Sequence, residues 1–407
     1  MFRSRFDGTG LIQSLTAQPW SSVVLNEGPP NAAATDQNPI PQPIPTFPSW
    51  QPYSPSTSQT FQGPSQNYQA SVWQRFSLDT QVELARDLIL DVGYVGGRGT
   101  KLYQSVYVNQ AGLASAADPI RGETTNGIGN IPLRVPYEGW NPAGLLINEP
   151  AGEAWYNSLQ ASLNKRFSHG LNLLVAYTYA RDLTDTQGGV VGGGFGGSIY
   201  GDQFTARQTS YGPEGFIRPQ RLVISYSYQL PHPSNLSSFA GRTLGGWMAS
   251  GVTTIQSGHQ LTAVTANPTN AYGVPYDRPD LVPGCDLGMK GSIQSRVGQY
   301  FNTACFTNPP LIANGDGVAT VFGNAPIGDI AGPGEVNFDF AVAKVVPLRF
   351  PKEGSSIEFR SEFFNLFNHP IFGDPSTAFG PGTGFGEITG PTVVSPRVIQ
   401  FALKYKF

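Results

Sequence analysis

Charged residues, cysteines and long apolar runs are all scarce in this sequence. Only 13% of the 407 residues are Asp, Glu, Lys or Arg, about half of the ~25% that soluble globular proteins carry. With a formal net charge of −3, the chain has no basic field for nucleic acid and no acidic tail. No apolar run approaches the ~18 residues of a membrane-spanning helix, which excludes that class of membrane protein.

Turn-forming and aromatic residues are abundant instead. The chain has 49 glycines and 35 prolines, and 12% of its residues are aromatic. Long helical patterns are missing, so the composition predicts an all-β protein rich in turns rather than an ordinary cytosolic enzyme.

Segments with the period-two alternation of β-strands recur along the chain. In 171–182, for example, Leu171, Leu173, Val175, Tyr177 and Tyr179 form one apolar face. We predict strands at 171–182, 221–230, 335–346, 356–368 and 397–407, weaker ones at 72–84, 87–96, 156–167 and 246–257, and a possible first strand near 9–18.

The connections between these segments alternate between long and short. The long connections are 19–71, 97–155, 183–218, 258–334 and 369–396; the shorter ones are 85–86, 168–170, 231–245 and 347–355. Long loops on one side and short turns on the other are typical of an antiparallel transmembrane β-barrel of the outer membrane, with extracellular loops and periplasmic turns. Strands of about 9–11 residues fit the bilayer. The sequence therefore predicts a barrel region at 72–407, preceded at 1–71 by a partial strand and a Pro/Gln/Ser-rich outer loop whose extended part is 36–66.

Two patterns could suggest enzyme chemistry, and both have simpler explanations. Gly192, Gly194 and Gly197 match GxGxxG, but neither a helix nor an acidic residue follows at the spacing of a dinucleotide site. We therefore expect a flexible loop. Glu358 and Glu362 could act as paired carboxylates, yet together with Arg360 they fit a lumen-facing charge ladder on one strand.

The remaining chemistry-bearing residues are few. The four histidines (His169, His232, His259 and His369) lack metal-ligand spacing, so we expect neither a metal nor another cofactor. Cys285 and Cys305 fall in the longest predicted loop, and we predict a disulfide between them.

The chain ends on a strand whose last residue is aromatic. Ile399, Phe401, Leu403 and Tyr405 alternate with more polar residues, and Phe407 is the terminal residue. In a barrel the last strand pairs with the first, which removes the edges of the sheet. We expect this apolar face to contact lipid.

Several ordered stretches resemble one known family. They are LDVGYVGGRGTKL (90–102), WYNSLQASLNKRFSHGLNLLVAYTYARDLTD (155–185), PQRLVISYSYQLP (219–231), GGWMASGVTTIQSGHQLT (245–262), YDRPDLVPG (276–284), YFNTACF (300–306), FGNAPIGDIAGPGEVNFDFAV (322–342), EFRSEFFNLFNHPIFG (358–373) and PRVIQFALKYKF (396–407). Together they resemble the C-terminal barrel portion of TonB-dependent outer-membrane receptors, in particular the Oar-like group with a carboxypeptidase-regulatory-like domain.

The resemblance implies a specific organisation. Such receptors have a signal peptide, a TonB box, a plug and about 22 barrel strands, whereas this sequence shows nine or ten strands. We therefore expect a fragment, or a chain with a misassigned start, that does not transport alone and meets TonB only through the missing plug. The resemblance also implies that Phe401, Leu403, Tyr405 and Phe407 form the signal read by the barrel assembly machinery.

The sequence does not determine the ligand, and it allows two other functions. An oligosaccharide, a siderophore or a peptide would all suit the family. If the ligand is a carbohydrate, we expect Trp140, Tyr200, Tyr211 and Tyr272 to stack on sugar faces, although packing within the loops explains them as well. The alternatives are a non-transporting structural or adhesive barrel and a secreted β-rich hydrolase that uses Glu358 and Glu362.

Overall fold

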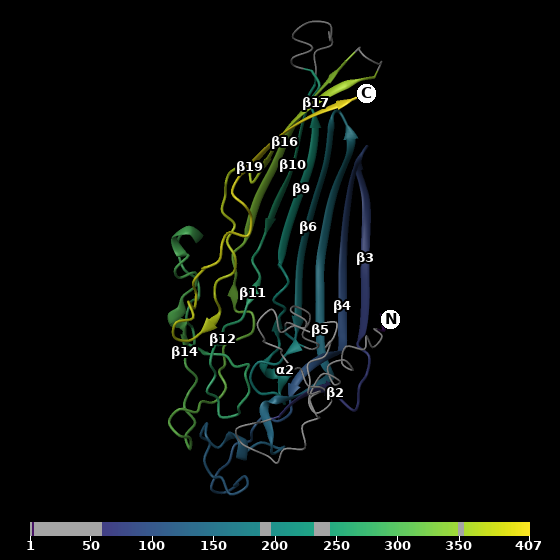
Figure 1. Ribbon diagram of the computed structural model, residues 1–407. Helices are drawn as coiled ribbons and strands as arrows, with labels where there is room; N and C mark the ends of the chain where they lie inside the picture. Colours follow the sequence, from purple (N-terminus) through teal and green to yellow (C-terminus); the bar gives the residue numbers. More distant parts are fainter. Residues whose placement is uncertain (1, 4–58, 188–196, 232–244, 349–353) are drawn as a thin grey trace, which may run out of the picture.

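A single curved antiparallel sheet dominates the molecule (Figure 1). The computed structural model describes residues 2–3, 59–187, 197–231, 245–348 and 354–407. Within this part of the chain, nine long strands follow one another in the order β3-β4-β5-β6-β9-β10-β16-β17-β19. They are β3 (Val72–Ala85), β4 (Leu88–Tyr107), β5 (Trp140–Ser168), β6 (Leu171–Thr184), β9 (Gln220–Gln229), β10 (Trp247–Gln256), β16 (Glu335–Pro347), β17 (Ser356–Phe364) and β19 (Val398–Lys406).

The predicted division into long and short connections is confirmed. The long connections gather at the lower end of the sheet in Figure 1, and the short turns lie at the upper end near the C-terminus. The turn between β3 and β4 contains Asp87 with φ 65°, and the turn between β5 and β6 contains His169 (φ 51°) and Gly170 (φ 81°). Left-handed backbone at these positions lets the chain reverse within two residues.

The strand register places apolar and polar side chains on opposite faces of the whole sheet. On β6, Val175 lies opposite Leu163 of β5 and Ile224 of β9. One residue further, Ala176 lies opposite Ser162 and Val223 on the other face. We call the face with Val175 the apolar face and the face with Ala176 the polar face. Because side chains alternate strictly along each strand, the pairing register assigns every strand residue to one of the two faces. The apolar face includes Phe76, Leu78, Val92, Tyr94, Leu159, Tyr177, Tyr179, Tyr226, Tyr228, Phe338, Phe340, Phe359, Phe363, Phe401 and Leu403.

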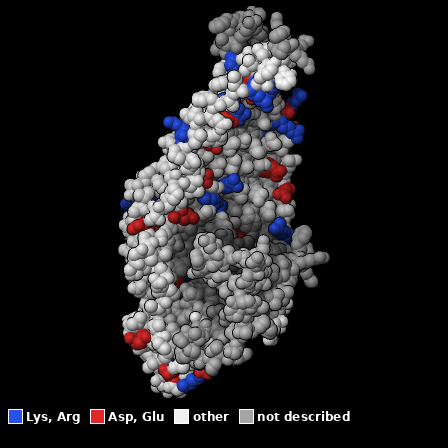
Figure 2. Space-filling view, in the orientation of Figure 1, with Lys and Arg blue, Asp and Glu red and all other residues white. Residues whose placement is uncertain are grey.

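Large side chains on the apolar face are so exposed that contact with water would be energetically unfavourable. Leu78 and Leu403 are each 74% exposed and Phe401 is 68% exposed. Exposed apolar surface on this scale marks an interaction with lipid or protein. In Figure 2 the charged side chains gather mainly toward the upper end, where the short turns lie, and are scattered over the rest of the described surface.

Some predicted boundaries were wrong. The expected loop 97–155 is shorter, because β4 continues to Tyr107 and β5 begins at Trp140, and the two strands stay paired beyond the length that crosses a bilayer. The strand expected at 356–368 ends at Phe364, since Asn365 (φ 50°) and Asn368 (φ 51°) leave the extended conformation. Part of the segment expected to be an extended loop forms β2 (Gln59–Pro64), which pairs with β5. The possible strand at 9–18 lies outside the described residues.

The loops form a packed layer with a core of its own. Tyr300, Phe301, Phe306 and Ile330 are buried together, with Phe385 contributed by the connection between β17 and β19. Phe385 meets Phe301, Phe306 and Phe379 edge to face, at centroid distances of 5.1–5.3 Å. Two connections far apart in sequence therefore share one core at the loop end. No helix within the described residues is both long and apolar enough to cross a membrane.

Candidate functional site

The polar face is hollowed where β6, β9, β10, β16 and β17 lie side by side. A groove of about 520 Å³ runs across it, lined both by small residues such as Ser225, Ser227 and Ser250 and by larger apolar ones such as Leu174 and Phe364. Asp339, Arg360 and Glu362 also line the groove and are charged. A concave polar face opposite a convex apolar one is the arrangement of a barrel wall around a wet lumen.

The predicted charge ladder lies on this polar face. Arg360 Nε lies 2.7 Å from Glu362 Oε1, and Lys406 Nζ of β19 lies 2.7 Å from Glu358 Oε2. Each carboxylate therefore has a cationic partner. The Glu358–Lys406 pair joins β17 to β19, and the Arg360–Glu362 pair lies within β17. Two carboxylates that are each paired with a cation do not suit a catalytic pair, of which one must hold a proton.

The C-terminal strand lies at an edge of the sheet. β19 pairs with β17 through nine residue pairs and has no second partner strand among the described residues. Phe401 stacks against Phe359 at 6.3 Å, and Tyr405 stacks against Phe407 at 5.8 Å. Phe407 itself is 88% exposed. The aromatic residues expected to form an assembly signal thus project from the sheet edge, while their recognition remains a prediction.

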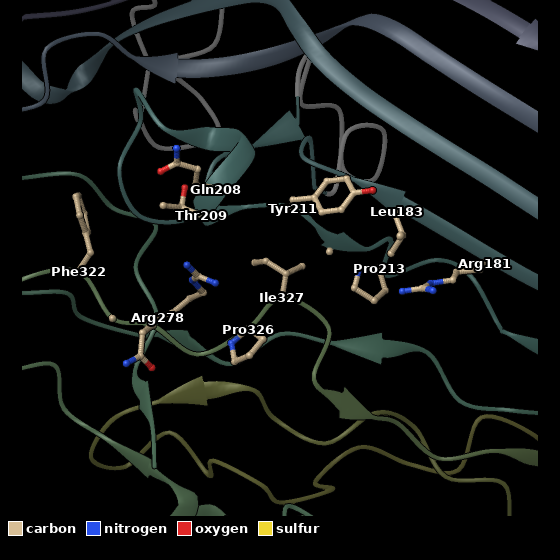
Figure 3. Close-up of a pocket in the computed structure, with 13 residues that line it drawn as sticks. Arg181, Leu183, Gln208, Thr209, Tyr211, Pro213, Arg278, Phe322, Pro326 and Ile327 are labelled. Carbon is tan, nitrogen blue, oxygen red and sulfur yellow. The ribbon is translucent and has the colours of Figure 1, made fainter. Parts of the chain in front are cut away.

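A second cavity, the loop cavity, lies where β6 meets the loop layer (Figure 3). Its volume is about 660 Å³. Among the described residues that line it, Arg181 and Arg278 are the only charged ones, and none is a carboxylate. The other walls are apolar or carry amides and hydroxyls: Leu183, Gln208, Thr209, Tyr211, Gly212, Pro213, Phe322, Gly323, Asn324, Pro326 and Ile327.

Different elements bring these residues together. Arg181 and Leu183 come from the end of β6; Gln208 and Thr209 come from the short helix α2 (Ala206–Thr209). Pro213 belongs to β8 (Gly212–Pro213), which pairs with the last residues of β6. The opposite wall consists of Arg278 and the segment 322–327. This segment packs closely against β8, because Gly212 leaves no room for a side chain beside Ile327.

Arg278 is buried but incompletely satisfied. Its side chain is 5% exposed, Nη1 donates to the Ala325 carbonyl at 2.5 Å, and Nε has no hydrogen-bond partner. Burial lowers the pKa of Arg278, while Asp277 and Asp329 oppose this effect. Asp277 accepts hydrogen bonds from the backbone N–H groups of Arg278 and Gly323 instead of the guanidinium.

Asp329 lies near Arg278 but makes no hydrogen bond. Both carboxylate oxygens are buried without a partner, and burial raises the pKa of Asp329 to about 6, with its own backbone N–H and Arg278 acting in the opposite direction. The folded protein therefore binds this proton more tightly than the unfolded chain, whose Asp pKa is near 3.8. The buried charge destabilises the fold increasingly as pH rises from about 4 to 6.

The substitution Asp329→Asn removes that buried charge. We expect it to raise the apparent melting temperature of the detergent-solubilised protein at pH 8, and to leave it unchanged near pH 4, where the wild-type carboxyl is already protonated. Thermal scans at both pH values measure the difference. The same gain at both pH values would show that the charge of Asp329 is not its cause.

The four aromatic residues considered for carbohydrate stacking do not converge on one surface. Tyr211 lines the loop cavity, but Arg207 covers its ring at 4.7 Å. Tyr272 stacks on Phe322 at 4.0 Å. Tyr200 packs edge to face on Tyr276 at 5.7 Å, and burial raises its pKa. Trp140 begins β5 and does not line the loop cavity. The rings of Tyr200, Tyr211 and Tyr272 therefore already pack against other loop residues.

Cys285 and Cys305 are joined in a disulfide, with their Cα atoms 5.5 Å apart. Cys305 is fully buried in the loop core. The bond closes a loop with a sequence separation of 20 residues, for which chain entropy alone gives about 3 kcal/mol.

Replacing both cysteines with serine should loosen the loop layer and leave the sheet intact. We expect faster proteolysis within 258–334 and unchanged heat-modifiable migration of the barrel strands, because the disulfide constrains only the loop. Non-reducing peptide mass spectrometry of the wild type provides the control. Free alkylation of both thiols would contradict the assignment.

The other sequence motifs show no clustering. Gly192, Gly194 and His232 lie outside the described residues, and Gly197 begins the two-residue strand β7 (Gly197–Ser198). His259 Nδ1 lies 3.0 Å from Asp374 Oδ2, which links two loops. In the part of the chain that the structure describes, no group of three or more His, Cys, Asp or Glu residues could hold a metal ion.

The sequence reasoning missed the two arginines of the loop cavity. Arg278 is 97 positions from Arg181 (278 − 181), and no spacing rule relates them. The position of Arg181 could have been recognised from the sequence, because the alternation of β6 places it on the same face as Tyr177 and Tyr179. A cation at that position lies just beyond an aromatic belt.

Comparison with known proteins agrees with this architecture. Residues 1–400 match the family model of the outer membrane beta barrel domain, and the chain belongs to that family. It is therefore a protein of the outer membrane, with an all-β, mostly antiparallel sheet. No curated protein matches the sequence.

Among solved structures, the outer membrane transporter YddB from Escherichia coli is similar with a TM-score of 0.43 and 8% sequence identity. The match covers 85% of this chain and 34% of the YddB chain. The chain thus spans about a third of the length of that transporter.

Proposed function

We propose that this chain forms part of the wall of a TonB-dependent outer-membrane receptor, whose lumen passes a scarce nutrient when TonB pulls on a plug. One observation supports this most: nine strands share one polar face, which is hollowed over five of them, and β19 has no second partner strand among the described residues. Unpaired strand edges are not tolerated in hydrocarbon, where each unsatisfied backbone group costs several kcal/mol. Further strands must therefore complete the barrel, and the family resemblance suggests about 22 in total.

The loop layer supports a role in ligand capture. It combines its own core, a disulfide and a cavity at the extracellular end, whereas loops with no binding role need no such internal order. An oligosaccharide, a siderophore and a peptide all remain possible substrates. We assign no catalytic role to Glu358 or Glu362, because each is held by a cation.

Growth of a deletion strain tests the proposal. Deleting the gene should abolish growth at limiting concentration of one nutrient in a panel of glycans, iron chelates and peptides. Deleting tonB should cause the same defect, and the double deletion should be no worse. Unchanged growth on every nutrient, accompanied by loss of surface adhesion, would instead indicate a non-transporting adhesive barrel.

A further inference from the structure

One end of the loop cavity, which we call the Arg278 pocket, differs chemically from the other. Its residues are Gln208, Thr209, Arg278, Phe322 and Asn324. In Figure 3, Pro213 and Ile327 lie between this pocket and Arg181, so Arg181 belongs to the other end of the cavity. The Arg278 pocket therefore contains a single cation among its described residues.

Three of the pocket residues meet beside Gly201. A Cβ atom on Gly201 would lie 3.8 Å from Thr209 Cβ and 3.9 Å from both Arg278 Nη2 and Phe322 Cγ. Gly201 has φ 91°, a conformation that favours glycine, and it places no side chain beside the guanidinium. Figure 3 shows the guanidinium of Arg278 directed toward α2, which carries Gln208 and Thr209. Segments far apart in sequence thus bring a cation, a hydroxyl and an aromatic ring together.

Arg278 presents an unused donor edge to this pocket. The residue is 5% exposed, and its Nη1 donates to the Ala325 carbonyl, whereas Nη2 makes no hydrogen bond to the described residues. Asp277 and Asp329 favour the charged form of Arg278 but do not line the cavity. A buried cation without an anionic partner is costly. An anionic group of a ligand would therefore be stabilised at Nη2.

The other polar groups of the pocket are neutral. Gln208 is exposed, and its amide makes no hydrogen bond to the described residues. Asn324 Oδ1 accepts a hydrogen bond from the Leu281 backbone N–H at 3.0 Å, which orients the amide. The ion pair between Arg207 and Glu153, at 2.9 Å, holds α2 in place.

Neutral amides favour a sugar over a peptide at this position. An amide both donates and accepts hydrogen bonds, as does a sugar hydroxyl. A short peptide would bring an ammonium group, for which the described lining offers no carboxylate. The pocket thus combines recognition of one negative charge with recognition of hydroxyl groups.

We propose that the Arg278 pocket binds the carboxylate of an acidic sugar, so that the nutrient captured by the loop layer is a uronic-acid oligosaccharide. Arg278 donates to the carboxylate in a charge-assisted hydrogen bond, and the amides of Gln208 and Asn324 bind ring hydroxyls. The ring of Phe322, stacked on Tyr272 at 4.0 Å, offers an apolar surface to the sugar C–H groups. A cavity of about 660 Å³ is within the range of small-ligand sites. This inference rests on the proposed uptake function and names the class of nutrient.

Calorimetric titration of the purified full-length protein in detergent tests the proposal. The probes are trigalacturonate and its fully methyl-esterified form, which keeps every hydroxyl but carries no charge. We expect the wild type to bind the acid at least about tenfold more tightly than the ester, the difference expected for one charge-assisted hydrogen bond. Arg278→Gln should lose this preference.

A pair of substitutions at Gln208 tests the charge without disturbing a buried residue. Gln208→Glu should weaken binding of the acid at least about tenfold, whereas Gln208→Lys should strengthen it, because the added charges have opposite signs beside the same carboxylate. A merely structural role of Gln208 would shift both variants in the same direction. Gln294→Glu changes an exposed glutamine of the short helix η3 (Ile293–Arg296), outside the pocket, and should behave as wild type. Heat-modifiable migration of each variant verifies folding.

Three outcomes would overturn the assignment. Equal binding of acid and ester by the wild type would remove the carboxylate from the site, and shifts of equal sign in both Gln208 variants would remove the electrostatic cause. Binding of ferric citrate or trialanine as tight as that of trigalacturonate would identify a carboxylate that does not belong to a sugar.

Failure of this inference and failure of the transport proposal are distinguishable. Equal binding of acid and ester, combined with tonB-dependent growth on some nutrient, would overturn the pocket assignment alone. Selective binding of trigalacturonate, combined with growth that depends neither on this gene nor on tonB, would overturn transport alone.

Discussion

Arginine in place of Val175 is expected to destabilise the protein by about 2–4 kcal/mol, the cost of a cation near the middle of the bilayer on the lipid side of a barrel. Val175 is the fifth residue of β6 and lies between Leu163 and Ile224 on the apolar face. The charge would enter hydrocarbon with no carboxylate on either neighbouring residue.

Ala176→Arg is the matched control. Ala176 is the next residue along the same strand, on the polar face beside Ser162. We expect a change within about 0.5 kcal/mol there, as for most solvent-facing substitutions. Denaturant titration of folding into phospholipid vesicles measures both variants. Equal cost at the two positions, or a greater cost at Ala176, would mean that the two faces are assigned the wrong way round.

Deletion of Phe407 should prevent most of the protein from reaching the outer membrane. Phe407 is 88% exposed, and Tyr405 is the only ring it stacks on in the described part of the chain, so its loss removes little packing. A large assembly defect would therefore reflect recognition of the terminal aromatic rather than lost stability. Comparing membrane-inserted and protease-sensitive fractions in cells measures the effect.

Lys404→Ala serves as the control for that deletion, because it alters the same strand on the polar face. We expect normal assembly of this variant. If the Phe407 deletion reaches the membrane as well as Lys404→Ala does, the terminal residue is not part of an assembly signal.

The strands were predictable because their signal is local. In β6, alternation from Leu171 to Tyr179 and the His169–Gly170 turn before it establish both the strand and its facing. The same holds for β9, β16 and β19. Alternation within each strand also constrains the register between neighbouring strands, because a shift of one residue would place polar side chains in lipid.

The loop layer could not be predicted in the same way. Its core joins Phe301 and Phe306 to Phe385, about 80 residues later, and its cavity joins Arg181 to Arg278. These contacts depend on how irregular segments pack against one another, and short-range periodicity in the sequence does not predict such packing. The paired extension of β4 and β5 was missed for a related reason: glycines such as Gly97 and Gly99 weaken the alternation there although the backbone remains in the ladder.

The central claim is that alternate residues of one strand face lipid and water in the outer membrane. Single cysteines at positions 173–178 of β6, tested in whole cells and in detergent-free outer-membrane vesicles, address it most directly. The account predicts that Leu174, Ala176 and Thr178, once replaced, react with a water-soluble maleimide, while replacements of Leu173, Val175 and Tyr177 react only with a lipid-soluble reagent. Uniform reaction at all six positions with the water-soluble reagent would contradict it.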